Sequence, residues 1–148
     1  MTTPSKPVRT ASTGHPLYSQ TFPCEPETAR RGRGLVRHAL GAWHLDHLSG
    51  TAELIISELV ANAFRHTPGR SIRLRVGRPG PVRVHIGVVD MAPARLPVLG
   101  PVDADGESGR GLVLIDALAD RWGCTLLGSH PFRGPWGKEI WAELEAAP

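Results

Sequence analysis

The chain has 148 residues and a mass of 15.9 kDa, which is the size of one domain, and 41% of its residues are apolar, as in ordinary globular cores. It contains no apolar run of about eighteen residues and no apolar segment near its N-terminus, so neither a membrane-spanning helix nor a secretory signal is expected, and the cytoplasm is the predicted location. The net charge is +3, but the basic residues are scattered and only 5% of the residues are aromatic, which argues against a nucleic-acid-binding surface.

The first half of the chain is predicted to hold a tail and two helices. Residues 1–20 are rich in Pro, Ser and Thr, so they are expected to form a flexible tail ahead of a folded domain at 21–148. Apolar residues at helical spacing predict a first helix from Glu27 to about Leu45. The same spacing predicts a second and clearer helix from Ser49 to Thr67, where a Pro-Gly pair follows and ends it.

The second half is predicted to be mostly strands. Alternating apolar and polar residues predict strands at Ser71–Val76 and from Pro81 to Asp90, and a long connection without predicted structure follows to about residue 108. A third helix is expected to begin near Gly109. Two last strands are predicted, at Cys124–Leu127 and Glu139–Leu144. This order predicts an α+β fold, a two-layer sandwich with helices on one face of a mixed, mostly antiparallel sheet.

Two polar residues of the second helix are suited to chemistry. Glu58 and Asn62 are four residues apart, so their side chains lie on one face of the helix. A carboxylate and an amide oxygen are hard ligands suited to magnesium, and a carboxylate can also accept a proton. Taken alone, however, such a pair is more often a polar stripe that faces solvent.

The third helix begins at a glycine turn. In Gly109-Arg110-Gly111-Leu112 the glycines allow close approach of the backbone, and the free amides of a helix N-terminus favour phosphate. The turn matches neither the dinucleotide-binding fingerprint nor a P-loop, and a Gly-x-Gly turn alone is usually only a helix entry.

The ordered set of motifs is more specific than any one of them. A helix with Glu58 and Asn62, a strand that ends at Asp90, a long loop and the turn at Gly109 follow one another in that order. This set resembles the histidine-kinase-like ATPase (GHKL) superfamily, and within it the small bacterial anti-sigma-factor serine kinases of the RsbW/SpoIIAB type. The resemblance covers about residues 20 to 145 and implies the fold of that superfamily, with ATP and Mg²⁺ as cofactors.

The resemblance implies a role for each motif. Asn62 matches the Asn that holds the magnesium ion bridging the phosphates, and Glu58 matches the acidic residue regarded as the general base. Asp90 matches the Asp that accepts the amino group of adenine. The segment 91–108 corresponds to the ATP lid. The second glycine box, which contacts the phosphates, corresponds to Gly109, Arg110, Gly111 and Leu112.

Two positions depart from the family pattern. The first glycine box has no glycine between Asp90 and Ala94, and Pro93 removes a backbone donor there, so close approach to the nucleotide is less assured. Glu139 stands where the family usually has a Thr that supports the adenine-binding Asp. A second carboxylate there would repel Asp90 unless Lys138 or a water intervenes.

The implied function is that of an ATP-dependent serine/threonine protein kinase. Its implied partners are a small anti-anti-sigma (STAS-type) protein, which it would phosphorylate, and a sigma factor; a homodimer built through the first helix is a further family-level expectation. The two departures leave open a non-catalytic regulator that binds ATP or only a partner. The catalytic half of a sensor histidine kinase fits less well, because that branch generally has Asn where Glu58 stands. No nucleic-acid or membrane partner is expected.

Overall fold

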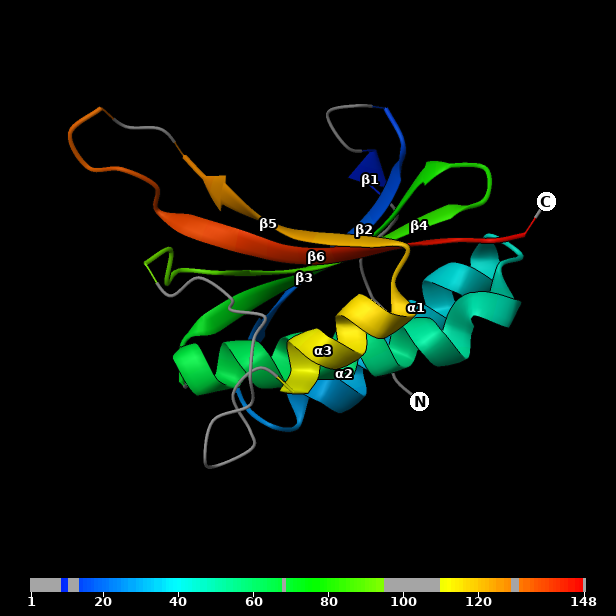
Figure 1. Ribbon diagram of the computed structural model, residues 1–148, viewed down its shortest axis with the longest axis horizontal. Helices are drawn as coiled ribbons and strands as arrows, with labels where there is room; N and C mark the ends of the chain where they lie inside the picture. Colours follow the sequence, from blue (N-terminus) through cyan, green and yellow to red (C-terminus); the bar gives the residue numbers. More distant parts are fainter. Residues whose placement is uncertain (1–8, 11–13, 68, 95–109, 129–130, 148) are drawn as a thin grey trace.

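The computed structural model describes residues 9–10, 14–67, 69–94, 110–128 and 131–147. A six-stranded sheet, in the order β1-β2-β3-β4-β6-β5, forms one layer, and the helices form a second layer on one of its faces (Figure 1). The predicted α+β sandwich is therefore confirmed, and every pairing among the described strands is antiparallel. None of the described helices is long and apolar enough to cross a membrane. The elements are β1 Arg9–Thr10, β2 Pro16–Pro23, α1 Thr28–Ala42, the 3-10 helix η1 Asp46–Leu48, α2 Ser49–His66, β3 Ser71–Gly80, β4 Arg83–Asp90, α3 Arg110–Leu118, β5 Arg121–Leu127 and β6 Gly137–Glu145.

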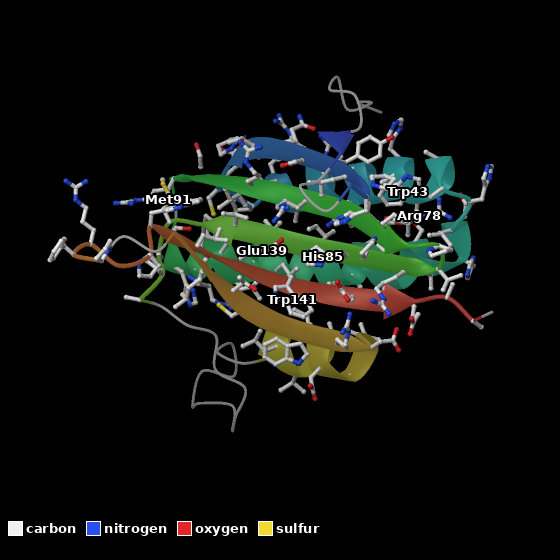
Figure 2. The ribbon with its side chains drawn as sticks, turned by 90° about the horizontal axis from the view of Figure 1, so that it is seen from above. Trp43, Arg78, His85, Met91, Glu139 and Trp141 are labelled. Atoms are coloured by element: carbon white, nitrogen blue, oxygen red, sulfur yellow. The ribbon has the colours of Figure 1, made fainter. Side chains whose placement is uncertain are left out.

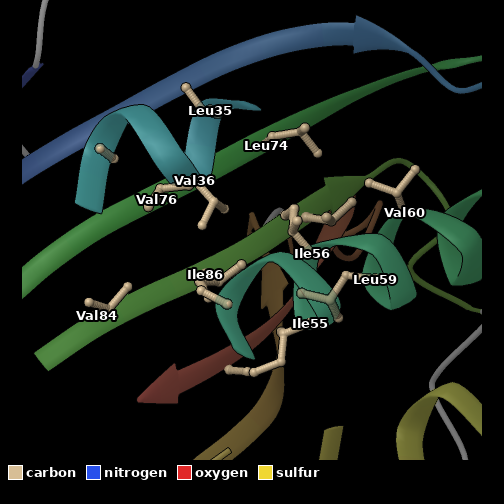
Figure 3. Packing of buried hydrophobic residues seen from close by; sticks show 14 of the residues in the cluster. Leu35, Val36, Ile55, Ile56, Leu59, Val60, Leu74, Val76, Val84 and Ile86 are labelled. Carbon is tan, nitrogen blue, oxygen red and sulfur yellow. The ribbon is translucent and has the colours of Figure 1, made fainter. Parts of the chain in front are cut away.

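The core lies between the sheet and helices α1 and α2 (Figure 3). The helices supply aliphatic side chains at helical spacing, and the strands supply every second side chain, so both sets meet in one layer. Full burial of one such side chain stabilises the fold by about 1.5–3 kcal/mol. The labelled members of this layer are Leu35, Val36, Ile55, Ile56, Leu59, Val60, Leu74, Val76, Val84 and Ile86, all buried.

Helix α1 ends earlier than the sequence pattern predicted. The expected helix ran to about Leu45, but α1 stops at Ala42 because His44 adopts a left-handed conformation with φ 58°. The amide of His44 donates to the carbonyl of Gly41, and the amide of Leu45 donates to the carbonyl of Leu40. These two bonds form a Schellman motif, which satisfies the last carbonyls of the helix and turns the chain away.

The N-terminal part of the sheet corrects the predicted tail. Strand β2 begins at Pro16, inside the segment expected to be flexible, and pairs with β3 from Leu17↔Gly77 to Pro23↔Ser71. Tyr18 and Phe22 of this strand are buried in the core. Because β2 contributes core side chains and a full ladder of strand pairing, residues 16–20 belong to the folded domain.

Candidate functional site

The side-chain oxygen of Asn62 is a buried hydrogen-bond acceptor that receives no hydrogen bond from the described residues. Asn62 is 7% exposed, and its Oδ1 atom has no hydrogen-bond partner among the residues that the structure describes. Leaving a buried acceptor unsatisfied costs about 1–3 kcal/mol. Mg²⁺ takes oxygen ligands and is usually held by one or two side chains together with substrate phosphates. The Asn62 amide oxygen therefore fits the magnesium role that the sequence predicts for it.

Glu58 lies one helical turn before Asn62 on α2. Four residues correspond to about 6 Å along the helix axis, so the two side chains lie on the same face of α2. Glu58 is half-buried, whereas Asn62 is buried. The Glu58 carboxylate is therefore partly accessible and lies on the same helix face as the Asn62 amide.

Asp90 forms the last residue of β4 and is only 1% exposed. Its two carboxylate oxygens have different surroundings. Oδ1 accepts hydrogen bonds from the amide of Ala92 and from Nζ of Lys138, both at 2.8 Å. Oδ2 is buried and has no partner among the described residues. The site thus contains a second unused acceptor, at the position where the sequence predicts recognition of the adenine amino group.

The C-terminal end of α2 and the end of β4 lie at the same end of the molecule, at the left of Figure 1. Thr67, directly after α2, donates a hydrogen bond to Sγ of Cys24 at 3.9 Å. Burial raises the pKa of the Cys24 thiol, the Thr67 hydroxyl lowers it, and the negative charge of Asp90 raises it further. Helix α2 also packs against β4, so the helix that carries Asn62 and the strand that ends at Asp90 are in contact.

The strand register shows that Lys138, and not Glu139, accompanies Asp90. Asp90 is paired with Lys138 across β4 and β6, and Val89 is paired with Glu139. Successive residues of a strand point to opposite faces, so Lys138 shares the helix-facing side with Asp90 and Glu139 points to the other side. The prediction that Glu139 stands beside Asp90 is wrong. Lys138 has no exposed surface and forms a buried ion pair with Asp90.

Glu139 belongs to a polar cluster on the open face of the sheet (Figure 2). Its Oε1 accepts a hydrogen bond from Arg75 at 3.2 Å, and its Oε2 lies 3.1 Å from Nε2 of His85. Gly87 makes room for the carboxylate, because a Cβ atom there would lie 2.1 Å from Oε2. The other ring nitrogen of His85 lies 3.0 Å from Glu143, and its ring stacks on Trp141. This cluster joins β3, β4 and β6 and is structural.

His85 should make the stability of the protein depend on pH. Burial of the imidazole alone lowers its pKa, but the hydrogen bonds and negative charges of Glu139 and Glu143 outweigh burial and raise it above 6.5. The stabilisation is therefore complete below about pH 6.5 and is lost as the pH rises through the pKa of the folded state. In urea unfolding between about pH 5.5 and 8.5, the excess stability of the wild type over His85→Gln should shrink as the pH rises.

The matched control for this pH series is His47→Gln, which removes an exposed imidazole from η1. It should leave the pH dependence of unfolding as in the wild type. An excess stability of wild type over His85→Gln that stays constant or grows from acid to alkaline pH would contradict the role given to the two carboxylates.

Helix α3 begins at Arg110, close to the predicted start, and lies beside α2 beneath the sheet (Figure 1). Leu112 is buried in the core and anchors the first turn. Gly111 is also in the first turn, whose amides have no carbonyl partner within the helix. Gly109 and the side chain of Arg110 lie outside the described residues, as does most of the segment predicted as the ATP lid.

The start of the predicted lid differs from an open glycine loop. Ala92 uses its amide for Asp90 Oδ1, and its carbonyl accepts a hydrogen bond from Lys138 at 2.6 Å. Both backbone groups of this residue are thus engaged within the protein. Residues 90–94 contain no glycine, and they form a turn that Lys138 holds in place through the Ala92 carbonyl.

Comparisons with known proteins found a similar protein and a matching family. A segment of 76 residues is 42% identical to the uncharacterized protein SCO4941 of Streptomyces coelicolor, and it covers 51% of this chain and 70% of that protein. Residues 22–127 match the family described as the histidine kinase-like ATPase domain, whose name implies ATP binding. The matched region runs from β2 to β5 and includes Asn62 and Asp90. This chain therefore belongs to the histidine kinase-like ATPase domain family.

Proposed function

We propose that this protein binds ATP together with Mg²⁺ in the cytoplasm and transfers the γ-phosphate to a serine or threonine hydroxyl of a small partner protein. The observation that carries the proposal is the pair of buried acceptors without partners among the described residues, Asn62 Oδ1 and Asp90 Oδ2. They stand at the positions where the family resemblance expects the ligands of magnesium and of adenine.

The nucleotide would be held by three parts of the chain. Asp90 accepts a hydrogen bond from the amino group of adenine through Oδ2, and Asn62 holds Mg²⁺ through Oδ1. The backbone amides of Gly111 and Leu112, at the start of α3, bind phosphate oxygens, as free amides of helix N-termini do. When bound, Mg²⁺ neutralises charge that develops on the phosphates.

Glu58 would serve as the base for phosphate transfer. Its carboxylate accepts the proton of the substrate hydroxyl, whose oxygen forms a bond to the γ-phosphorus. The bond between that phosphorus and the bridging oxygen breaks, and ADP leaves with the bond electrons. The half-buried position of Glu58, one turn from Asn62, supports this role because it leaves room for a second substrate.

The proposed partners follow from the anti-sigma-factor kinase branch that the motifs resemble. The phosphate acceptor is a small anti-anti-sigma protein of the STAS type, and the same kinase binds a sigma factor. A homodimer is the proposed assembly.

Replacing Glu58 by Ala tests the kinase function. ATP binding measured by calorimetry should stay within about 3-fold of wild type, while transfer from labelled ATP to a STAS-type partner falls about 10²- to 10⁴-fold. Ser57→Ala is the matched control, because the Ser57 hydroxyl donates to the Glu53 carbonyl and accepts from Arg33 on another face of α2. This variant should keep both ATP binding and phosphate transfer. Equal transfer by Glu58→Ala and wild type would exclude Glu58 as the base.

A non-catalytic regulator of the same fold is the second candidate. It is favoured by the turn at Ala92, whose backbone amide and carbonyl are both engaged within the protein. This candidate predicts saturable ATP binding by the wild type without transfer to the partner. Absence of ATP binding by the wild type would contradict the kinase and this ATP-binding form of the regulator, and would leave a regulator that binds only a partner.

A further inference from the structure

The residue beside Asp90 is Lys138, a cation, and not the Thr that usually supports this Asp in the family. Cross-strand pairing puts Lys138 directly opposite Asp90, on the helix-facing side of the sheet. Its side chain is fully buried, which is costly for an ammonium group unless it is paired. Here the Nζ atom donates to Asp90 Oδ1 and to the carbonyl of Ala92. Lys138 is thus a buried part of the site whose ammonium group has two acceptors.

Gly137, the residue before Lys138, fixes this arrangement. A Cβ atom at Gly137 would lie 2.6 Å from the carbonyl oxygen of Asp90, so β6 approaches the end of β4 as closely as only glycine allows. The close approach fixes where the Lys138 side chain starts relative to the Asp90 carboxylate. The ammonium group therefore acts on one defined oxygen.

Among the described residues, the hydrogen-bond donors all lie on one side of the Asp90 carboxylate. Lys138 and the amide of Ala92 both donate to Oδ1, and Oδ2 receives nothing from the described residues. A carboxylate in an ion pair is acceptor-only, so Oδ2 can take only a hydrogen-bond donor from a ligand. Adenine carries an amino group at position 6 of its ring, whereas hypoxanthine and guanine carry a carbonyl oxygen there, which would face Oδ2 acceptor to acceptor.

We infer that Lys138 is a positioning residue that sets base selectivity: it holds Asp90 by Oδ1 and so reserves Oδ2 for the amino group at position 6 of a purine. The inference rests on the proposed nucleotide binding at this site. Without Lys138, the Asp90 carboxylate loses the donor that fixes its orientation, so it can turn and Oδ2 is no longer reserved for the amino group. Selectivity between the two kinds of base then declines.

The test compares the dissociation constants of ATP and ITP, which differ at position 6 of the base, by calorimetry with Mg²⁺. Wild type should bind ATP at least about 10-fold more tightly than ITP, the effect expected for one hydrogen bond to a charged group. In Lys138→Met this ratio should fall to about 3-fold or less, whatever happens to the affinity for either nucleotide alone. Lys138→Arg, which keeps a cation beside Oδ1, should keep most of the selectivity.

A merely structural role for Lys138 would weaken ATP and ITP by the same factor, and an unchanged ratio in Lys138→Met overturns the inference. Arg75→Met is the matched control, because it removes an ion pair with Glu139 from the opposite face of the sheet, and its ratio should equal that of the wild type. If Lys138→Met shows no cooperative melt, Lys138→Gln is measured by the same criterion.

Results for the wild type separate this inference from the proposed function. Tight binding of ATP and ITP with equal affinity would overturn the selectivity attributed to Asp90 and Lys138 and would leave nucleotide binding standing. Binding of neither nucleotide would remove the proposed function, and the inference would fall with it.

Discussion

Asn62→Ala should lower the affinity for ATP in the presence of Mg²⁺ by about 100-fold. The substitution removes the buried oxygen that has no partner among the described residues and that the proposal assigns to the metal. Loss of groups that only orient a metal ligand already costs about 10- to 100-fold in metal affinity, so loss of the ligand itself should reach the upper end of that range. Calorimetry with Mg²⁺ and with a chelator measures the effect.

The chelator arm decides whether the loss is due to the metal. Without Mg²⁺ the affinities of wild type and Asn62→Ala should differ by about 3-fold or less, since base contacts are unchanged. Asn62→Asp keeps an oxygen ligand and should keep the Mg²⁺ dependence. If Asn62→Ala weakens ATP equally in both buffers, its amide does not hold the metal.

Asp90→Ala should destabilise the fold by about 3–5 kcal/mol, because it leaves the ammonium group of Lys138 buried without its carboxylate. The double variant Asp90→Ala/Lys138→Met buries no charge at this place, so it should recover at least about half of that loss. Both values come from the midpoint and slope of urea unfolding.

Glu145→Ala is the control for the stability series. It removes the ion pair with Arg83, in which the Arg83 side chain is 40% exposed and the Glu145 side chain 51% exposed. Such an exposed pair contributes about 0–1 kcal/mol to the free energy of unfolding. A double variant no more stable than Asp90→Ala would show that the Lys138–Asp90 pair is not the cause of the destabilisation.

The elements with strong periodicity could be predicted from the sequence. Helix α2 was expected from Ser49 to Thr67 and is observed over Ser49–His66, and β4 ends at Asp90 as expected. In these segments the hydrophobic pattern and the helix- and strand-ending residues agree. The same pattern placed Glu58 and Asn62 on one helix face.

Strand β2 could not be predicted in this way because its side chains do not alternate. Leu17 and Tyr18 are adjacent and both buried, and Pro16 and Pro23 at its ends are typical of loops. Pairing with β3, which is distant in sequence, makes this segment a strand. Composition alone therefore assigned residues 16–20 to a tail.

The partner of Asp90 was missed for a similar reason. The alternation within β6 was recognised, but nothing in a single sequence states which of its residues lies opposite Asp90 in β4. A shift of one residue in the pairing moves each side chain to the other face of the sheet. Glu139 and Lys138 are neighbours in β6 and therefore point to opposite faces. Glu139 contacts Arg75 and His85 on one face, and Lys138 contacts Asp90 on the other.

Titration of the wild-type protein with ATP and Mg²⁺, beside Asn62→Ala, is the most direct test of whether Asn62 and Asp90 form a nucleotide site. The expected result is saturable binding at one site per chain for wild type and a loss of about 100-fold in affinity for Asn62→Ala. No saturable binding by the wild type, or equal binding by the two proteins, would contradict the assignment of these residues to ATP and Mg²⁺.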